Sequence, residues 1–568
     1  MVTARAETEH RTLIGSTARQ LGAYYTPSVA ALHMARWALR TGDDRVLEPS
    51  AGDGQFVRAV KSHGWELDNG SPDVWGVEIA RDTHDELIRR GVLPADRAIY
   101  GDFLEVKPFP VDVVIGNPPF VRLRHLSEVE ASRARLAAER VLGRPMERDG
   151  STWMPFVLHA TQFLSLGGRL AFVLPHDATH VRYARPLWQY LASSFRTLRV
   201  VRVHERLFPD ILQDVILLLA DGHGGSTNSI EFEAFESVDD LSLGLPSVRK
   251  RIDVSRLVRG ERVFVEALLA PELVDLLQGS IARTTNPVRD LASFNIGYVC
   301  GDKRFFHPSR QTVAHFQLPA SSLLPTLASG RVARSLGMHT SSLEPDDISR
   351  LFLPPQGREL STPESRYIFH GSMTGASDRY KCRVREPWYI TPDVRQPDLL
   401  VPVFASKPIL LINDAGLAAS NSFLVGRLRT GTPERFAAAW YTTLTLLQVE
   451  LEIHSLGGGV MILIPGETGS IRLAHSVPGI SHLSEVDRLL RREQIDQAYA
   501  AGDGPILRDA MGLSKDETSL VAEGLETLRW WRTARDRHLE SSVEDIPYDQ
   551  PLLEGIDQPI YEGVEAHI

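Results

Sequence analysis

The segment Asn117-Pro118-Pro119-Phe120 combines residue types that can reshape an amino group. Two consecutive prolines hold the backbone extended and remove two N–H donors, so a carbonyl in the loop stays open as an acceptor. The Asn117 side-chain oxygen and the Pro118 carbonyl can then both accept from one –NH2 group and aim its lone pair at an electrophilic methyl group. Phe120 offers a flat face on which a planar base can stack. The alternative, a proline-rich turn after a strand, explains neither the asparagine nor the aromatic ring.

A glycine turn at residues 47–54, Leu-Glu-Pro-Ser-Ala-Gly-Asp-Gly, follows another expected strand. Glu48 ends the strand, and Ala51, Gly52 and Gly54 let the backbone turn sharply and approach a ligand closely. The turn lacks both the Gly-x-Gly-x-x-Gly pattern and the Lys-Ser/Thr pair of phosphate-binding loops. A nucleoside cofactor without a pyrophosphate therefore fits better than NAD or ATP.

Acidic residues end the next two expected strands. Glu78 can accept from both hydroxyls of a ribose, as acids do at this place in dinucleotide folds. Asp102 can accept from an adenine amino group, with Phe103 beside the ring. Either acid alone would favour a solvated carboxylate at a strand end. Three consecutive strand ends with residues that suit a ligand favour a cofactor site.

The segment Tyr25-Thr26-Pro27 precedes an amphipathic stretch at residues 29–39. We expect Thr26 to be the N-cap of a helix and Pro27 its first residue. Free amides and a hydroxyl at a helix start can bind a carboxylate, such as the methionine end of a cofactor. The alternative is only a well-formed helix start.

Strands and helices alternate through the first half of the chain, which predicts a doubly wound α/β domain. The last strand, at 214–220, is expected to complete the sheet. The predicted strands are 45–48, 75–79, 98–102, 111–115, 168–175, 199–204 and 214–220, and the predicted helices are 54–63, 81–90 and 153–166.

The pattern changes after a polar, glycine-rich break at 221–226. Short β-like runs then lie between turns, at 295–300, 367–370, 409–413 and 460–464. Helices are predicted at 484–500, 506–511 and 514–537, and Ser514 with Glu517 forms a capping-box pattern at the start of the last one. The acidic residues 541–568 show little periodicity and are expected to be a tail.

Composition limits the class of protein. The chain has 568 residues, enough for two or three domains. No apolar run approaches the ~20 residues of a membrane helix, and the N-terminus lacks the apolar stretch of a secretory signal. Two cysteines, Cys300 and Cys382, cannot frame a cysteine-type zinc site. We expect a cytoplasmic, metal-independent monomer.

The net charge of −10 at first argues against a nucleic-acid partner, but residues 481–568 alone carry an acidic excess of that size. Local basic patches decide phosphate binding.

Taken in order, these motifs resemble the gamma class of DNA adenine-N6 methyltransferases, which accompany or belong to restriction–modification systems. The resemblance covers residues 22–220 and implies a class I methyltransferase (Rossmann-like) fold that uses S-adenosylmethionine and no metal. It implies catalytic residues at Asn117, Pro118, Pro119 and Phe120. It implies cofactor contacts at Tyr25, Thr26, Pro27, Glu48, Ala51, Gly52, Gly54, Glu78, Asp102, Phe103 and Asn117. Phe208 matches a later motif whose ring stacks on the other face of the target base, and a buried strand-edge phenylalanine is an equal alternative.

Residues 293–480 resemble the target-recognition domains of the same class, at 294–306, 380–389, 413–422 and 454–459. Arginine and lysine beside aromatic residues suit phosphates and base edges, although a surface salt bridge is the alternative for each one. The expected DNA-binding residues are Arg122, Arg124, Lys303, Arg304, Lys381, Arg383 and Arg385. For the arginine-rich segment 121–150, a solvated helix face is an equal alternative.

The expected organisation is an N-terminal arm (1–20), a catalytic domain (21–240), a connector (241–290), a mixed α+β recognition domain (291–480), a helical region (481–540) and the tail. We expect double-stranded DNA as the substrate and a restriction endonuclease or defence-system subunits on separate chains. The alternatives are an RNA or protein-glutamine methyltransferase, or a non-catalytic DNA specificity subunit.

Overall fold

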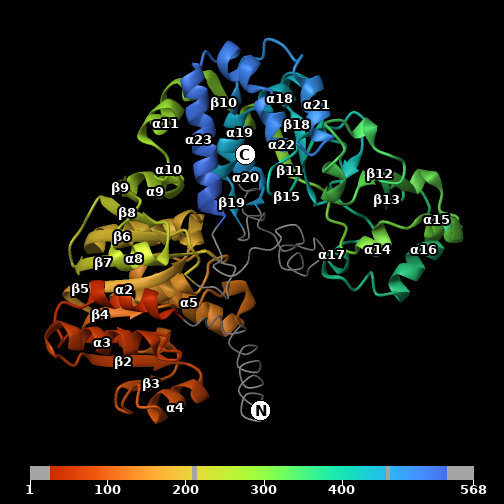
Figure 1. The fold of residues 1–568 in the computed structure, drawn as a ribbon. Helices are drawn as coiled ribbons and strands as arrows, with labels where there is room; N and C mark the ends of the chain where they lie inside the picture. The colour runs from red at the N-terminus through yellow and green to blue at the C-terminus, as the bar shows by residue number, and fades with distance from the viewer. Residues whose placement is uncertain (1–25, 208–213, 456–460, 534–568) are drawn as a thin grey trace, which may run out of the picture. The chain divides into compact units, whose positions relative to one another are not determined.

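The computed structural model describes residues 26–207, 214–455 and 461–533. The chain divides into two compact units, one ending at Leu268 and one spanning Leu269–Thr533 (Figure 1). The expected N-terminal arm and acidic tail, together with Tyr25 and Phe208, lie outside the described residues.

The first unit is built on a nine-stranded sheet with the order β3-β2-β1-β4-β5-β7-β6-β8-β9. Strands β3 to β5 run parallel, whereas β7 is antiparallel to both β5 and β6. The strands are β1 (Arg45–Glu48), β2 (Asp73–Glu78), β3 (Ala98–Tyr100), β4 (Val111–Gly116), β5 (Leu164–Pro175), β6 (Phe195–Val203), β7 (Val215–His223), β8 (Ser229–Phe235) and β9 (Val248–Asp253).

Helices cover both faces of this sheet, so the predicted doubly wound α/β fold is confirmed. They are α2 (Ser28–Ala38), α3 (Gln55–Asp68), α4 (Arg81–Arg89), α5 (Glu128–Leu142), α6 (Trp153–Thr161), α7 (Arg185–Ser194), α8 (Val238–Leu243), α9 (Val254–Arg259) and α10 (Val263–Glu266). Short turns of 3-10 helix, including η1 (Phe103–Glu105), η2 (Leu123–His125) and η3 (His176–Thr179), follow strand ends or loops.

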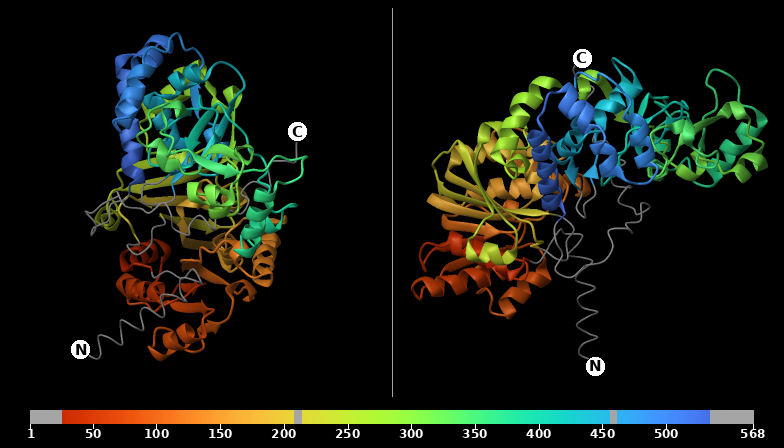
Figure 2. Two further views of the ribbon diagram at one scale, coloured as in Figure 1. Left: turned by 90° about the vertical axis from the view of Figure 1, so that its right-hand side faces the viewer. Right: turned by 45° about the horizontal axis from the view of Figure 1, so that its top comes forward.

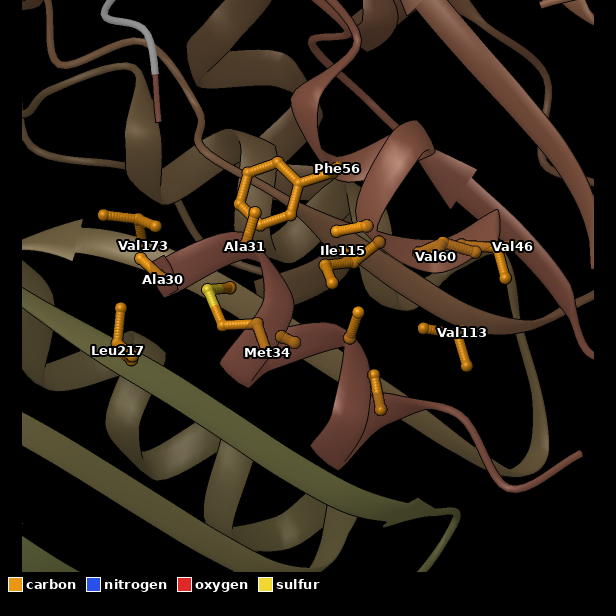
Figure 3. Packing of buried hydrophobic residues seen from close by; sticks show 14 of the residues in the cluster. Ala30, Ala31, Met34, Val46, Phe56, Val60, Val113, Ile115, Val173 and Leu217 are labelled. Atoms are coloured by element: carbon orange, nitrogen blue, oxygen red, sulfur yellow. The ribbon is translucent and has the colours of Figure 1, made fainter. Parts of the chain in front are cut away.

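Strand β4 shows why the sheet must be covered on both sides. Successive side chains of a strand point to opposite faces, yet Val113, Val114 and Ile115 are all fully buried. Val113 and Ile115 pack with Met34 of α2 and Phe56 of α3 (Figure 3). Val114 points to the opposite face. A strand with such a continuous apolar run is typical of a buried parallel sheet.

The chain reverses its winding between β1 and β4. From β1 it proceeds to β2 and β3 on one side, and it then returns to place β4 on the other side of β1. Ligands of open α/β sheets bind at such a reversal, outside the carboxyl ends of the strands. The turns after β1, β2, β3 and β4 all lie at this edge because these strands are parallel.

The second unit holds four small sheets, with the orders β10-β21, β11-β18-β14-β16, β13-β12-β17 and β15-β20-β19. Figure 2 shows the ribbon from two further sides. Its strands are β10 (Thr285–Pro287), β11 (Ala292–Ile296), β12 (Leu323–Leu327), β13 (Ser349–Phe352), β14 (Leu399–Pro402), β15 (Phe404–Ala405), β16 (Leu411–Ile412), β17 (Ala418–Ala419), β18 (Phe423–Leu428), β19 (His454–Ser455), β20 (Met461–Ile462) and β21 (Arg472–Ala474).

Helices of the second unit lie between and after these strands. They are α11 (Pro271–Leu276), α12 (Ala282–Thr284), α13 (Val288–Leu291), α14 (Lys303–Phe306), α15 (Arg310–Phe316), α16 (Thr362–Met373), α17 (Tyr380–Arg383), α18 (Pro433–Trp440), α19 (Thr443–Glu452), α20 (Pro465–Thr468), α21 (Leu483–Leu490), α22 (Ile495–Ala500) and α23 (Lys515–Arg532), with a π-helical segment η9 at Asp503–Ala510. The predicted mixed α+β character of this region is confirmed.

Two predictions about the first unit's elements are wrong. The strand near 214–220 does not complete the sheet, because β8 pairs with β6 and β9 with β8. The helix predicted over 153–166 ends at Thr161, and Leu164 already pairs with Val111 as part of β5. The helical periodicity of this segment would continue past Thr161, but the pairing of β5 with β4 ends the helix there. The local sequence does not show that pairing.

Two predictions about the second unit are also wrong. Residues 367–370 lie in α16, which a capping box of Ser361 and Glu364 begins and which buries Tyr367 and Ile368 on one face. The helix predicted at 484–500 is two helices, α21 and α22, separated by a turn in which Glu493 has a φ of 58°.

The long helix α23 is fixed to α19 by a buried ion pair. The predicted capping box is confirmed, since Ser514 accepts from the Glu517 N–H. Near the other end, Arg532 donates to both oxygens of Glu450, at 2.7 and 2.9 Å. The Glu450 side chain is only 3% exposed and that of Arg532 12%.

We expect Arg532→Met to loosen α23, because the substitution leaves the Glu450 carboxylate buried without its main partner. Removing one member of a buried pair costs about 3 kcal/mol or more, so the amides of α23 should exchange with solvent about a hundred-fold faster in hydrogen-exchange measurements. The double variant Glu450→Leu/Arg532→Met should recover much of the protection. Equal exchange in the single and double variants would contradict this account.

Candidate cofactor and target-base site

The turn after β1 is held against β2 by its own amides. The Ala51 N–H donates to the Val77 carbonyl at 2.9 Å, and the Gly52 N–H donates to Glu78 Oε2 at 2.9 Å. Gly52 and Gly54 adopt positive φ values of 51° and 80°. A Cβ on Gly54 would collide with Val92, whereas one on Gly52 would have no atom within 4 Å. Gly54 thus packs inward, and the backbone at Gly52 is open to a ligand.

Glu48 lies beneath this turn and is almost fully buried, with 2% of its surface exposed. Its Oε2 accepts from the Val57 N–H at 3.2 Å, which ties β1 to the first turn of α3. Burial raises the pKa of Glu48 well above its usual value, and the nearby carboxylates of Asp53 and Glu78 raise it further. A cation bound beside it would reverse this tendency.

Glu78 is held in place from both sides. Besides Gly52, the Ala80 N–H donates to its Oε1 at 2.8 Å. Each carboxylate oxygen can still accept a further hydrogen bond from a ligand. The next residue, Ile79, is 53% exposed although it is apolar. The sequence analysis did not single out Ile79. Its position directly after Glu78, the acid at the end of β2, could have marked it as a residue beside the ligand.

Asp102 caps the η1 turn and is part of an ion pair. Its Oδ1 accepts from the Leu104 N–H at 3.0 Å, and its Oδ2 accepts from Arg133 at 2.7 Å. Phe103 is 2% exposed, and its ring packs against those of Phe156 and Phe163. The ring of Phe103 therefore belongs to the core. Sequence reasoning did not foresee the contact between Arg133 and Asp102.

The loop after β4 is fixed by hydroxyl groups from two other segments. Ser50 Oγ donates to the Asn117 carbonyl at 2.9 Å, and Thr152 Oγ1 donates to the Pro119 carbonyl. The Asn117 side chain donates from Nδ2 to Thr26 Oγ1 at 3.3 Å. Between the two occupied carbonyls, that of Pro118 accepts no hydrogen bond from any residue that the structure describes. Sequence reasoning missed Ser50 and Thr152.

The start of α2 differs from its prediction. Pro27 is the N-cap, helix α2 begins at Ser28, and no side chain caps it. The Thr26 hydroxyl is 3.3 Å from Asn117 Nδ2, so the expected capping role of Thr26 is wrong. The structure nevertheless brings Thr26 beside the loop after β4, residues 117–120, which we call the target loop. Phe120 is half-buried and packs against the core of the sheet.

Arg122 and Arg124 leave the target loop in different environments. Arg122 donates to Asp177 at 3.1 Å and to the Tyr183 hydroxyl at 3.3 Å, which ties the loop exit to the turn after β5. Arg124 is exposed and lies beside His125. Of the two, Arg124 is more open to a phosphate.

In the second unit, four of the five expected basic residues lie on α14 and α17, which are neighbours in Figure 1. A Cβ on Gly301 would lie 3.2 Å from Lys381 Cβ, so the two segments are adjacent. Arg385 donates to the carbonyls of Val299 and Cys300, at 2.6 and 3.0 Å, and thus fastens one segment to the other. Lys303, Arg304 and Arg383 are exposed and Lys381 is half-buried, and we call these four residues the α14–α17 patch.

The residues at the edge of the first sheet suit a cationic ligand. Four acids lie at or just after the ends of three adjacent strands: Glu48, Asp53, Glu78 and Asp102. We call this cluster the acidic mouth, and it would repel a pyrophosphate.

Among the described residues, no group of three or more His, Cys, Asp or Glu side chains is placed to hold a metal ion. No helix within the described ranges is long and apolar enough to cross a membrane.

Comparisons with known families agree with this site. Residues 101–208 match the family model described as Eco57I restriction-modification methylase. Residues 261–507 match the C-terminal domain of type II methyltransferase M.Eco57I. The first match includes the target loop, and the second spans most of the second unit.

Individual relatives give the same result. The type II methyltransferase M.AccI of Acinetobacter calcoaceticus is 24% identical over 71% of this chain and 75% of its own. M.PaeR7I of Pseudomonas aeruginosa is 31% identical over 27% of this chain and 30% of its own.

A solved structure of a nuclease-deletion mutant of the Type ISP restriction-modification enzyme LlaGI, in complex with a DNA substrate mimic, shares the fold. Its TM-score is 0.50 at 9% identity, and the match covers 83% of this chain and 47% of that one. The chain thus spans about half the length of this structure. By the two family matches and M.AccI, the chain is similar to the Eco57I-family type II restriction–modification DNA methyltransferases.

Proposed function

We propose that this protein transfers a methyl group from S-adenosylmethionine to the exocyclic N6 amino group of adenine in double-stranded DNA, as the gamma-class resemblance implies. The observation that carries the proposal is the target loop. Its backbone is pinned at Asn117 and Pro119, and the Pro118 carbonyl between them accepts nothing from the described residues. A rigid, open acceptor beside an asparagine side chain suits a donor –NH2 group.

The residues of the first unit fit the proposed cofactor. The acidic mouth complements its sulfonium and ammonium charges, and Gly52 leaves its backbone accessible. Glu78 would accept from the ribose hydroxyls, and Asp102 from the adenine amino group. Ile79, exposed between them, would cover one face of the adenine ring. Thr26, beside Asn117, would lie at the methionine end.

S-adenosylmethionine supplies the electrophilic methyl group when it is bound. The protein's part is to position the acceptor amino group at near-attack distance and orientation. Acceptance of both amino hydrogens by Asn117 and the Pro118 carbonyl turns the nitrogen lone pair toward the methyl carbon. The methyl group would then pass to that nitrogen, its bond to the sulfonium sulfur breaking and a neutral thioether leaving as the carbon–nitrogen bond forms, and one amino proton would leave to water. The target base must be flipped out of the duplex, and stacking on Phe120 offsets part of that cost.

The α14–α17 patch would contact the DNA. Lys303, Arg304 and Arg383 are exposed there, Lys381 is half-buried, and Tyr380, 48% exposed, lies beside Lys381. Positive side chains next to an aromatic ring suit phosphates and base edges. Arg124 would add a phosphate contact near the target loop. We further propose that a restriction endonuclease acts from a separate chain.

We expect Asn117→Ala to abolish most methyl transfer, because one of the two acceptors that orient the amino group is lost. The rate at saturating cofactor should fall by about a hundred-fold or more. Labelled S-adenosylmethionine is incubated with unmethylated genomic DNA, and the digested nucleosides are identified. The exposed Asn286→Ala in β10 is the matched control and should methylate normally.

N6-methyladenine from the wild type and the control would support the proposal. N4-methylcytosine would overturn the choice of base. Label in RNA or protein, with none in DNA, would overturn the choice of substrate.

The raised pKa of Glu48 predicts that cofactor binding depends on pH. A positively charged ligand favours the ionised carboxylate, so binding should release a proton, and affinity should increase as pH rises above the usual titration range of a carboxyl group. Calorimetry in buffers of different ionisation enthalpy measures the proton count. Glu48→Gln should bind more weakly and lose this part of the pH dependence. Proton uptake on binding would contradict the prediction.

The double variant Lys381→Ala/Arg383→Ala should weaken DNA binding uniformly across sequences, because phosphate contacts are lost. The slope of log affinity against log salt should decrease by about 2, roughly one for each lost contact. Cofactor affinity should not change. Arg310→Ala, an exposed arginine of α15 outside the patch, is the control. An unchanged salt slope in the double variant would place the DNA elsewhere.

A further inference from the structure

Arg133, on α5, reaches the acidic residue that follows β3. Its Nη1 donates to Asp102 Oδ2 at 2.7 Å, and its Nε lies 2.8 Å from Glu105 Oε1. The hydrogen bond to Asp102 is the main cause of a raised pKa at Arg133. The guanidinium of Arg133 therefore bridges the carboxylates of Asp102 and Glu105. Because its donors are engaged there, it is less available to bind DNA phosphates.

The carboxylate of Asp102 is fixed at both of its oxygens. The Leu104 N–H holds Oδ1 at 3.0 Å, and Arg133 holds Oδ2. Together these two hydrogen bonds prevent rotation of the Asp102 carboxylate about its Cβ–Cγ bond. Each oxygen retains a second acceptor position, and 17% of the side chain is exposed, so a ligand can still reach it.

We infer that Arg133 is a positioning residue for the adenosine end of the cofactor, acting by orienting Asp102 to accept from the adenine amino group. This inference rests on the proposed function, because it assigns an adenosine to the edge of the sheet. Without Arg133, the backbone amide of Leu104 holds one oxygen only. The other oxygen then rotates or binds water, and the acceptor is no longer preorganised.

Two ligands that differ only at the exocyclic group test this role. S-adenosylhomocysteine carries the amino donor, and S-inosylhomocysteine carries an oxygen in its place. The full-length wild type should bind the adenosyl compound more tightly, by about ten-fold, since the inosyl compound offers Asp102 no amino donor. In Arg133→Met the adenosyl affinity should fall by a similar factor, while the inosyl affinity stays constant, so the preference disappears.

Two further variants separate orientation from general stability. Arg133→Lys should recover part of the preference, because an ammonium can still donate to Asp102. Glu105→Gln removes the other acidic partner and should retain the preference. In Arg133→Met the KM for S-adenosylmethionine should rise by about ten-fold, and the loss should fall on KM rather than on kcat.

Equal weakening of both ligands in Arg133→Met would show a merely structural role and overturn the inference. An unchanged preference would also overturn it, while leaving the proposed function intact. A wild type that binds neither ligand would defeat the proposed function and this inference with it.

Discussion

The site depends on one constraint, the burial of β4 on both faces. Because Val113, Val114 and Ile115 are all enclosed, the strand cannot slide or rotate without exposing apolar surface. Its carboxyl end is therefore a fixed point, and the loop at 117–120 projects from it. Ser50 and Thr152 then hold the loop on either side of Pro118. The rigidity of the proposed acceptor is thus a property of the sheet as much as of the two prolines.

The same edge of the sheet collects the other functional groups through chain topology. The return of the chain to the far side of β1 places β4 beside β1, so Asn117 and Ser50 meet although they are distant in sequence. Glu78 and Asp102 join them because β2 and β3 run parallel to β1. Each acid is also tied down locally, Glu78 by Gly52 and Ala80, and Asp102 by Leu104 and Arg133. Preorganised groups of this kind lose little freedom when a ligand arrives.

The sequence predicted the strand ends well because apolar β-branched runs and glycine turns are local signals. It placed β1 and the carboxylates after β2 and β3 correctly in the sheet. It could not show the contact between Arg133 and Asp102, or that of Thr26 with Asn117. Each contact joins two residues that are distant in sequence and become neighbours only in the folded chain. The aromatic run at 367–370 suggested a strand, whereas its helical spacing of buried residues appears only once Ser361 and Glu364 are seen to cap α16. In the second unit, Arg385 shows the same limit: it stands among the basic residues expected to bind DNA, but it donates to the carbonyls of Val299 and Cys300.

The acidic mouth also bears on what happens after the reaction. The proposed sulfonium cofactor would lose its positive charge when its methyl group leaves, so the spent molecule would be less strongly attracted to Glu48, Asp53 and Glu78 than the one that entered. Electrostatics would then favour exchange of spent for fresh cofactor and limit product inhibition. The carboxyl of Glu48, whose pKa is raised mainly by burial and further by the other acids, could take up a proton as the positive charge departs. A single cluster of acids would in this way load the site and help to empty it.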